Sequence, residues 1–335
     1  MPSSDGPNGQ SGREPSTSAA ITAPAAGTVQ TDLAGRLAGY VSQAKAANTR
    51  RAYAGDWRHF VAWSRARQAA PLPAMAETVA LYATALAATA RTSTIARRMA
   101  AISQAHQMAG YPSPTADARV RTVLAGIRRA KGVAPRVKKP VLVEDLRAML
   151  AALPATLGGV RDRALLLVGF GGAFRRSELV ALNWEDIEFA TEGLAVTIRR
   201  SKNDPEGQGR RVGIPRGRQE ETCPARALLA WRDAAGGDSG PVFRPVDRHG
   251  NLGKSRLSDR AVARIVKRAL PTGRYDPAEY AGHSLRAGLA TAAAMGGASE
   301  RAIMRQTGHR SLTIVRRYIR EGSLFRENAA AKTGL

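Results

Sequence analysis

The sequence predicts an α+β fold that is mostly α-helical and divided into two parts. Aromatic residues make up only 5% of the chain against 44% hydrophobic residues, so the core must consist mainly of Ala, Leu, Val and Ile, which favours helices. Apolar residues recur at helical spacing throughout the first part, whereas β-like runs occur only in the second. With 335 residues, the chain is long enough for two domains.

The first part should be an all-α bundle that follows a disordered tail. Residues 1–28 are rich in Ser, Pro, Gly and Ala and cannot bury a core. Residues 29–131 contain several amphipathic helical segments with short connections. In the segment NTRRAYAGDWRHFVAWSRARQ, for example, Tyr53, Trp57 and Phe60 form one apolar stripe. This pattern predicts a compact helical bundle.

The second part should combine helices with a small antiparallel sheet. The basic, proline-bounded segment GVAPRVKKP, residues 132–140, is expected to be a linker, although a plain loop would have the same composition. In residues 141–335, the runs DIEFA and LAVTIRRSK are joined around TEG as a hairpin. The run at 211–215, with the flanking Arg210, adds a third strand. The remaining segments of this part read as helices.

The charge balance favours a nucleic acid as the partner. Lys and Arg total 51 against 27 Asp and Glu, a formal net charge of +24. Basic side chains on one face neutralise phosphates and release counterions. Charge for solubility alone is the plainer interpretation. No apolar stretch reaches the ~18 residues that a membrane span needs, and Cys223, as a single cysteine, excludes an intrachain disulfide. We expect a cytoplasmic, nucleoid-associated protein that does not bind membranes.

Four short stretches stand out from the helical background. They are GAFRRSELVAL (172–182), RRSKNDPEG (199–207), GHSLRAG (282–288) and TGHRSLTIVRRYIR (307–320). In order and spacing they resemble the boxes of the tyrosine recombinase (phage integrase) family, as in its Cre-like site-specific recombinases. The resemblance covers roughly residues 45–325 once the helical first part is included.

This resemblance implies a covalent route for breaking and resealing DNA. Resealing without ATP requires that the phosphodiester energy be stored, and a tyrosine oxygen can store it as a 3′-phosphotyrosine. Tyr318 would be the nucleophile, although a bare tyrosine at helical spacing is usually a packing residue. Arg175 and Arg286 match the two family arginines that clamp the scissile phosphate bidentately. His283, three residues before Arg286 on the same helical face, would be a general base or phosphate donor.

The resemblance also assigns three supporting positions. Lys202, at the tip of the predicted hairpin, would protonate the leaving 5′ oxygen, although basic hairpins also simply contact phosphates. His309 would donate to a non-bridging oxygen and pack against the helix of the tyrosine. Glu178 would orient a neighbour rather than contact DNA. The first box departs from the family pattern, because Ala173 and Phe174 precede the arginine and the glycine is displaced by one residue.

The helical first part resembles the family's core-binding domain, which implies that it clamps the duplex opposite the catalytic domain. Arginines at helix starts and on the hairpin are therefore candidates for phosphate or base contacts. These candidates are Arg50, Arg51, Arg97, Arg98, Arg199 and Arg200.

The expected partners are a double-stranded DNA recombination site and three further copies of the chain. A homotetramer would exchange strands through a Holliday junction, with Leu324 and Phe325 packing either into a neighbouring subunit or into their own. No metal, cofactor or small-molecule substrate is expected, because His and Asp do not cluster at ligand spacings. Three alternatives stay open: a topoisomerase-like or telomere-resolving enzyme, a catalytically inactive DNA-binding regulator on the same fold, and a basic RNA-binding protein.

Overall fold

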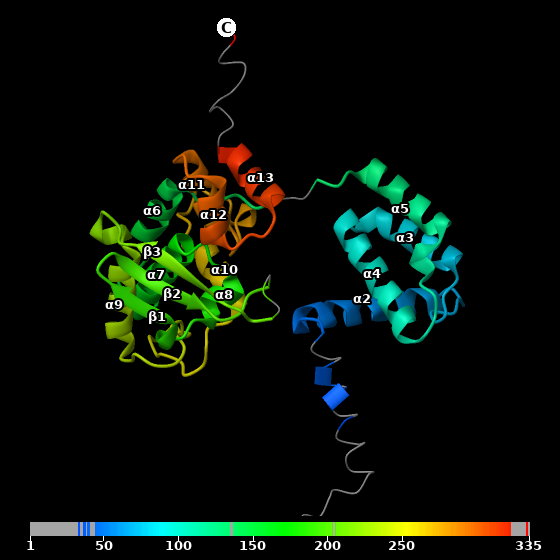
Figure 1. The fold of residues 1–335 in the computed structure, drawn as a ribbon, viewed down its shortest axis with the longest axis horizontal. Coiled ribbons are helices and arrows are strands. Elements are labelled where there is room, and N and C mark those ends of the chain that lie inside the picture. Colours follow the sequence, from blue (N-terminus) through cyan, green and yellow to red (C-terminus); the bar gives the residue numbers. More distant parts are fainter. Residues whose placement is uncertain are drawn as a thin grey trace, which may run out of the picture. The chain divides into compact units, whose positions relative to one another are not determined.

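The computed structural model divides the chain into two compact units, residues 1–135 and 136–335 (Figure 1). It describes residues 33, 36, 37, 39, 40, 44–134, 137–202, 204, 206–322 and 333. The predicted disordered tail, residues 1–28, and the predicted apolar plug of Leu324 and Phe325 lie outside the described residues. None of the helices in the described part is long and apolar enough to cross a membrane.

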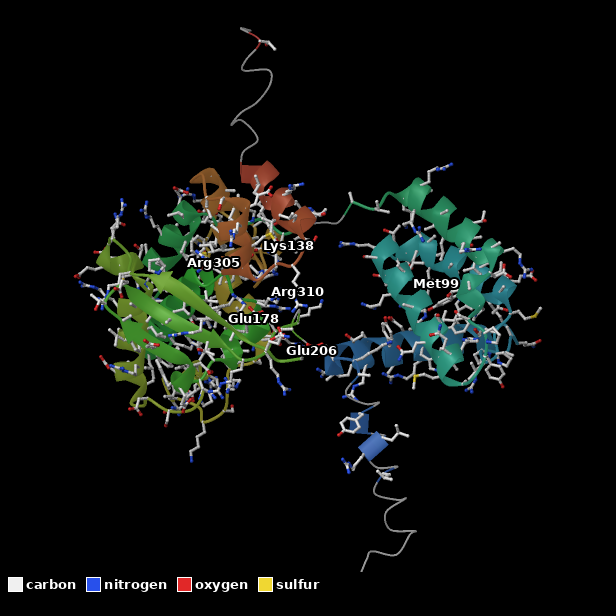
Figure 2. All side chains as sticks on the ribbon, in the orientation of Figure 1. Met99, Lys138, Glu178, Glu206, Arg305 and Arg310 are labelled. Carbon is white, nitrogen blue, oxygen red and sulfur yellow. The ribbon has the colours of Figure 1, made fainter. Side chains whose placement is uncertain are left out.

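The first unit is built of helices. They are α2 (Ala47–Arg65), α3 (Ala76–Thr89), α4 (Thr92–Met108), the short 3-10 helix η1 (Pro114–Ala116) and α5 (Ala118–Lys131). Helix α2 packs on α4, and α3 packs on α5. The core between them consists of buried apolar and aromatic side chains, among them Phe60, Tyr82, Ile95 and Ile102. Figure 2 shows another core residue, Met99, inside this unit.

A buried histidine connects the turn before α3 to helix α4. The His106 Nε2 atom accepts a hydrogen bond from the backbone N–H of Ala74 at 2.8 Å, and Nδ1 lies 2.8 Å from the carbonyl oxygen of Ile102. Because a carbonyl oxygen only accepts, the proton of the ring lies on Nδ1. His106 therefore has a structural role inside the bundle.

The second unit contains a three-stranded antiparallel sheet with helices around it, which confirms the predicted α+β, mostly helical fold (Figure 1). The strands are β1 (Ile187–Ala190), β2 (Gly193–Ile198) and β3 (Arg210–Pro215), with β2 in the middle. The helices are α6 (Val143–Ala151), α7 (Leu157–Gly171), α8 (Arg176–Ala181), α9 (Pro224–Ala235), α10 (Asp259–Arg268), α11 (Ser284–Met295), α12 (Glu300–Thr307) and α13 (Leu312–Gly322), with 3-10 helices η2 (Trp184–Asp186), η3 (Glu220–Thr222) and η4 (Pro277–Glu279).

Alternation along the strands places one face of the sheet in the core. Leu194 and Val196 of β2 are buried and pair with Ile214 and Val212 of β3. The predicted run to Lys202 is too long, because β2 ends at Ile198. A longer loop follows, since the Asp204 carboxylate accepts backbone N–H groups of the loop itself and draws it away from strand pairing.

Helix α7 is the central helix of the second unit. Its residues 164–169 are all buried, and it contacts both α9 and α11. Helix α11 also approaches the segment just before α6, where Val141 N–H donates to the Ser284 carbonyl oxygen at 2.9 Å. An added Cβ at Gly288 would lie only 1.9 Å from the carbonyl oxygen of Val141. Gly288 is therefore required for this close approach of two backbones.

We predict that Gly288→Ala displaces α11 and lowers the free energy of unfolding of the second unit by about 1–3 kcal/mol, as overpacking typically does. Hydrogen exchange in urea, read by mass spectrometry on peptides from residues 284–295, measures this change. Gly237→Ala is the matched control, because an added Cβ there meets nothing within 4 Å. Equal protection of α11 in both variants would contradict the prediction.

Candidate active site

Arg175 precedes helix α8, and a carboxylate of the same turn holds it in place. Glu178, which is buried, accepts a hydrogen bond from the Arg175 backbone N–H at 3.0 Å through Oε2. Its Oε1 atom accepts from Arg175 Nη1 at 2.5 Å. The first bond satisfies an N–H that a helix start leaves open, and the second orients the guanidinium. Glu178 therefore fixes both the backbone and the side chain of Arg175.

The turn before Arg175 takes a conformation that usually belongs to glycine. Ala173 has a φ of 48°, in the left-handed region that few residues with a Cβ adopt. The preceding Gly172 is needed for a second reason, since an added Cβ would lie 2.2 Å from the ring of Phe174. The displaced glycine of the first box is thus compatible with the turn, because Ala173 itself takes the glycine-like conformation.

Arg286 is a fully buried guanidinium whose hydrogen-bonding capacity is only partly used. Its Nη1 donates to the carbonyl oxygen of Ala173 at 2.7 Å. Its Nε and Nη2 atoms are buried and have no hydrogen-bond partner among the described residues. Burial, followed by the positive charge of Arg175, lowers the pKa of Arg286 to about 10. Unpaired buried donors on a charged group carry a large desolvation penalty, which an anion placed beside them would offset.

His283 and Tyr318 meet although they lie on different helices. Tyr318 projects from α13 and His283 caps the start of α11, with His283 Nε2 3.1 Å from the tyrosine oxygen. Burial, and then the charges of Arg286, Arg175 and Arg176, lower the pKa of His283 below its usual 6.5. The imidazole is therefore neutral at physiological pH and can accept a proton from the phenol.

His309 covers the other side of the tyrosine. Gly308, in the left-handed conformation, ends α12, and the following His309 ring stacks on the Tyr318 ring at a centroid distance of 5.9 Å and 30°. Its Nδ1 is buried and has no hydrogen-bond partner within the described part of the chain. Burial, and then the charges of Arg286 and Arg175, lower the pKa of His309 to about 3. A neutral ring has one N–H to donate, and its tautomer decides which nitrogen carries it.

Helix α13 is docked on its own unit by an apolar face. Tyr318 and Val315 are buried against alanines of α11 and against Ile303 of α12. On the outer side, Arg316 forms a two-bond ion pair with Glu300, with Nε–Oε1 and Nη2–Oε2 distances of 3.0 and 3.3 Å. These contacts hold Tyr318 against α11 and α12 of the second unit.

Lys202 is exposed in the loop between β2 and β3, and it is not among the side chains that meet around Tyr318. Its loop does border the site. Ser201 and Asp204 line a cavity of about 160 Å³ together with Gly308 and His309. The loop is shaped by Asp204, whose carboxylate accepts the backbone N–H of Gly209 at 2.8 Å. The role of Lys202 in the reaction stays a prediction.

The arginines predicted to bind DNA fall into two groups. Arg50, Arg51 and Arg200 are exposed, and Arg51 bonds to the Asn48 side chain. The others are ion-paired within the protein. Arg97 binds Asp56 through Nε at 2.7 Å and Nη2 at 3.0 Å, Arg98 lies 3.6 Å from the same carboxylate, and Arg199 binds Asp186 at 2.5 Å. Their contact with DNA stays a prediction.

Sequence reasoning missed Arg210 as a site residue. It is the first residue of β3, and its Nη2 lies 3.4 Å from Oε2 of Glu178. Nothing in the sequence separates it from its many basic neighbours, because only the pairing of β3 with β2 and the approach of α12 bring it to the site. Across the described residues, no cluster of three or more His, Cys, Asp or Glu side chains could hold a metal ion.

We predict that His283 and His309 both titrate below pH 6.5 in the DNA-free protein, with His309 near 3. NMR titration of the ring protons, assigned through His283→Gln and His309→Gln, measures these values. The urea-unfolded chain is the reference, where imidazoles titrate near ~6.5. Since the unfolded chain then binds more protons below pH 6.5, stability should decrease as the pH falls from 6.5 towards 3. A folded-state midpoint at or above 6.5 for either residue would contradict this.

Comparison with known proteins places the chain among enzymes that share this architecture. The model of the phage integrase family matches residues 141–323. An integrase/recombinase xerD homolog from Selenomonas ruminantium is 43% identical over 294 residues, 86% of this chain and 86% of the relative. A tyrosine recombinase XerC from Syntrophus aciditrophicus is 29% identical over 190 residues, 55% of this chain and 58% of the relative.

Two solved structures support the fold. A lambda integrase dimer bound to a COC′ core site has a TM-score of 0.56 and 16% identity, over 87% of this chain and 94% of that one. The Tn1549 transposon integrase in complex with transposon right end DNA has a TM-score of 0.53 and 17% identity, over 73% and 80%. The family model and the xerD homolog together show that the chain belongs to the tyrosine recombinase (phage integrase) family.

Proposed function

We propose that this tyrosine recombinase is a site-specific DNA recombinase that cleaves and rejoins DNA through a 3′-phosphotyrosine and exchanges strands through a Holliday junction. The observation that carries the proposal is the contact between Tyr318 and the neutral His283 at 3.1 Å, next to a buried arginine with unpaired donors. A phenol next to a base is an activated nucleophile, and the arginine supplies the positive charge that a phosphate requires.

In the cleavage step, the Tyr318 oxygen attacks the scissile phosphorus. The phenolic proton passes to His283 Nε2, the bond between phosphorus and the Tyr318 oxygen forms, and the bond from phosphorus to the 5′ oxygen breaks. Lys202 donates a proton to that leaving oxygen. Attack by a 5′-hydroxyl on the phosphotyrosine reverses each transfer and releases Tyr318. The phosphodiester energy is conserved in the intermediate, so the rejoining step needs no nucleotide cofactor.

The arginines hold the phosphate while its charge increases. Arg175 and Arg286 bind the non-bridging oxygens, and the neutral His309 donates a further hydrogen bond. Removing one such preorganised donor typically raises the barrier by roughly 3–4 kcal/mol. Since Arg286 is fully buried in the DNA-free protein, neighbouring side chains must move for the phosphate to reach it.

The proposed substrate is a double-stranded recombination site bound by a homotetramer, with two subunits active at a time. Support comes from the net charge of +24 and from the solved relatives, whose structures contain a core site or a transposon end. The first unit would clamp the duplex as a core-binding domain, with the exposed Arg50 and Arg51 as phosphate contacts.

Tyr318→Phe should bind the recombination site with unchanged affinity and form no covalent adduct, because the attacking oxygen is gone. A nicked suicide substrate, which traps the phosphotyrosine, measures this by denaturing gel electrophoresis. Tyr111→Phe, at an exposed position of the first unit, is the control and should form adduct at the wild-type rate. An adduct in Tyr318→Phe would remove the nucleophile assignment. No adduct in the wild-type chain on its own site would favour an inactive DNA-binding regulator.

Lys202→Ala should slow cleavage about 10²–10⁴-fold, the usual contribution of a general acid. A substrate with a 5′-bridging phosphorothiolate should restore most of the rate, because a thiolate leaves without protonation. Arg200→Ala is the matched control on the same loop. It should weaken DNA binding at both substrates equally, as a phosphate contact does. A Lys202→Ala defect that the phosphorothiolate does not relieve would place the proton donor elsewhere.

A further inference from the structure

Arg210 connects three elements of the site by direct hydrogen bonds. Its Nη2 donates to Oε2 of Glu178 at 3.4 Å, and its Nη1 donates to the backbone carbonyl oxygen of Gln306 at 3.1 Å. Glu178 belongs to α8 and Gln306 to the last turn of α12, whereas Arg210 begins β3. One guanidinium thus joins the sheet to α8 and to the end of α12.

The guanidinium also lies directly against the residue before His309. An added Cβ at Gly308 would lie 2.9 Å from Arg210 Nε and 3.1 Å from its Cζ. Gly308 has a φ of 64°, so a side chain there would be strained as well as in collision with the arginine. The turn that carries His309 is therefore shaped by Arg210 from one side and by the glycine conformation from within.

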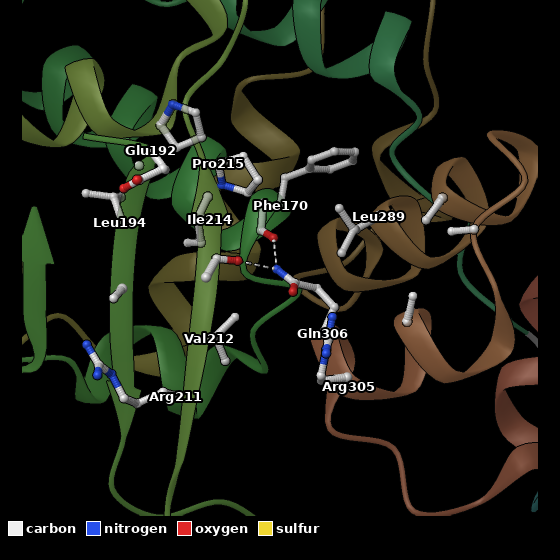
Figure 3. A pocket seen from close by; sticks show the side chains of 18 of the residues that line it. Phe170, Glu192, Leu194, Arg211, Val212, Ile214, Pro215, Leu289, Arg305 and Gln306 are labelled. Atoms are coloured by element: carbon white, nitrogen blue, oxygen red, sulfur yellow. Dashed lines mark hydrogen bonds between the residues drawn. The ribbon is translucent and has the colours of Figure 1, made fainter. Parts of the chain in front are cut away.

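A second link holds the same end of α12 to β3 and to the end of α7. The Gln306 side-chain amide donates to the carbonyl oxygens of Gly171 and Gly213 at 2.7 and 2.9 Å, as Figure 3 shows. It lies at a cavity of about 800 Å³ between β2, β3, α11 and α12, which none of the candidate catalytic residues lines. The side chain of Gln306 thus fixes α12 to the sheet, and its backbone carbonyl receives Arg210.

The guanidinium of Arg210 is partly buried, and it binds the same carboxylate, that of Glu178, as Arg175 does. Burial lowers the pKa of Arg210, and the charge of Glu178 counteracts this effect. Glu178 binds Arg175 through both oxygens and Arg210 through one. Both outer nitrogens of Arg210 are used within the protein, whereas its Nε is buried and has no hydrogen-bond partner among the described residues. Arg286 keeps both Nε and Nη2 unpaired, so Arg210 has less capacity than Arg286 to bind a phosphate of the substrate.

We propose that Arg210 is a positioning residue for cleavage, which acts by holding the Gly308–His309 turn against α8 and β3. The inference rests on the proposed function, since it concerns how His309 is placed beside the phosphate. Loss of Arg210 would leave the α12 backbone carbonyl without its donor and free His309 to move. A displacement of about 1 Å at a catalytic group can slow a reaction roughly 100-fold.

Arginine suits this position better than lysine. Its planar fork presents two N–H groups in fixed directions, one for a carboxylate and one for a carbonyl, whereas a lysine ammonium is a compact point charge. Arg210→Lys should keep a charge beside Glu178 and lose the simultaneous bond to Gln306. It is therefore the variant that preserves the fold and still removes the link to His309.

The test is a double-mutant cycle on adduct formation with the suicide substrate. Arg210→Met and Arg210→Lys should each slow adduct formation about 10–100-fold, with DNA affinity within about threefold of wild type. In a His309→Ala background the same changes should add less than about twofold, because they act through His309. In a Lys202→Ala background the same changes should slow adduct formation by their full factor, because the effects of independent residues multiply.

Arg211→Met is the matched control. Arg211 is the next residue of β3, and it forms a surface ion pair with Glu188. It should leave the rate unchanged. The proposal is overturned if Arg210→Lys slows adduct formation by the same factor in the wild-type and His309→Ala backgrounds. It is also overturned if Arg210→Lys lowers DNA affinity in proportion to the rate, or if Arg211→Met slows adduct formation equally. Hydrogen exchange of α12 distinguishes a folding defect in Arg210→Met from the expected displacement of His309 in a folded protein. If the wild-type chain forms no adduct, the proposed function itself is contradicted, and this inference is contradicted with it.

Discussion

The burial of the Arg286 charge is the constraint on which the rest of the second unit depends. A guanidinium with no exposed surface is stable only where the backbone and neighbouring charges are placed to receive it. Here one carbonyl oxygen accepts from it, at a turn where Ala173 adopts a left-handed conformation. Its Nε and Nη2 have no hydrogen-bond partner among the described residues, so the protein maintains a positively charged site whose free donors a phosphate would bind.

Much of the surrounding fold can be understood as support for that site. The central helix α7 ends just before the strained turn, and α11, which carries Arg286, is held close by Gly288. Glu178 is the buried carboxylate that binds Arg175 and Arg210, so one acid balances part of the charge of three neighbouring arginines. Burial, and then the same excess of positive charge, lowers the pKa values of His283 and His309, which keeps both rings neutral.

Tyr318, the proposed nucleophile, is placed by weaker forces than Arg175 and Arg286, the proposed phosphate-binding arginines. Helix α13 rests on alanines and one isoleucine, and its outer ion pair with Glu300 is exposed, where such pairs contribute little. A helix held in this way can shift without disturbing the core. The arginines are held more firmly than the tyrosine. This agrees with the proposed reaction, in which the phosphate enters a fixed, positively charged site and the tyrosine moves to it.

The fold class and the residue types of the candidate site could be predicted from local patterns, because helical periodicity, strand alternation and short boxes are local properties. The three strands and most helices could be predicted, although β2 ends at Ile198, since the Asp204 carboxylate binds the backbone of the loop.

Which of these residues come into contact depends on the tertiary structure. His283 and Tyr318 are 35 positions apart, and Arg210 and Gln306 are 96 apart. It also places Arg97, which the sequence predicts as a DNA contact, in an ion pair with Asp56, and it brings Arg210 next to Glu178. Such pairings depend on how helices pack across the sheet, and no local pattern encodes that packing.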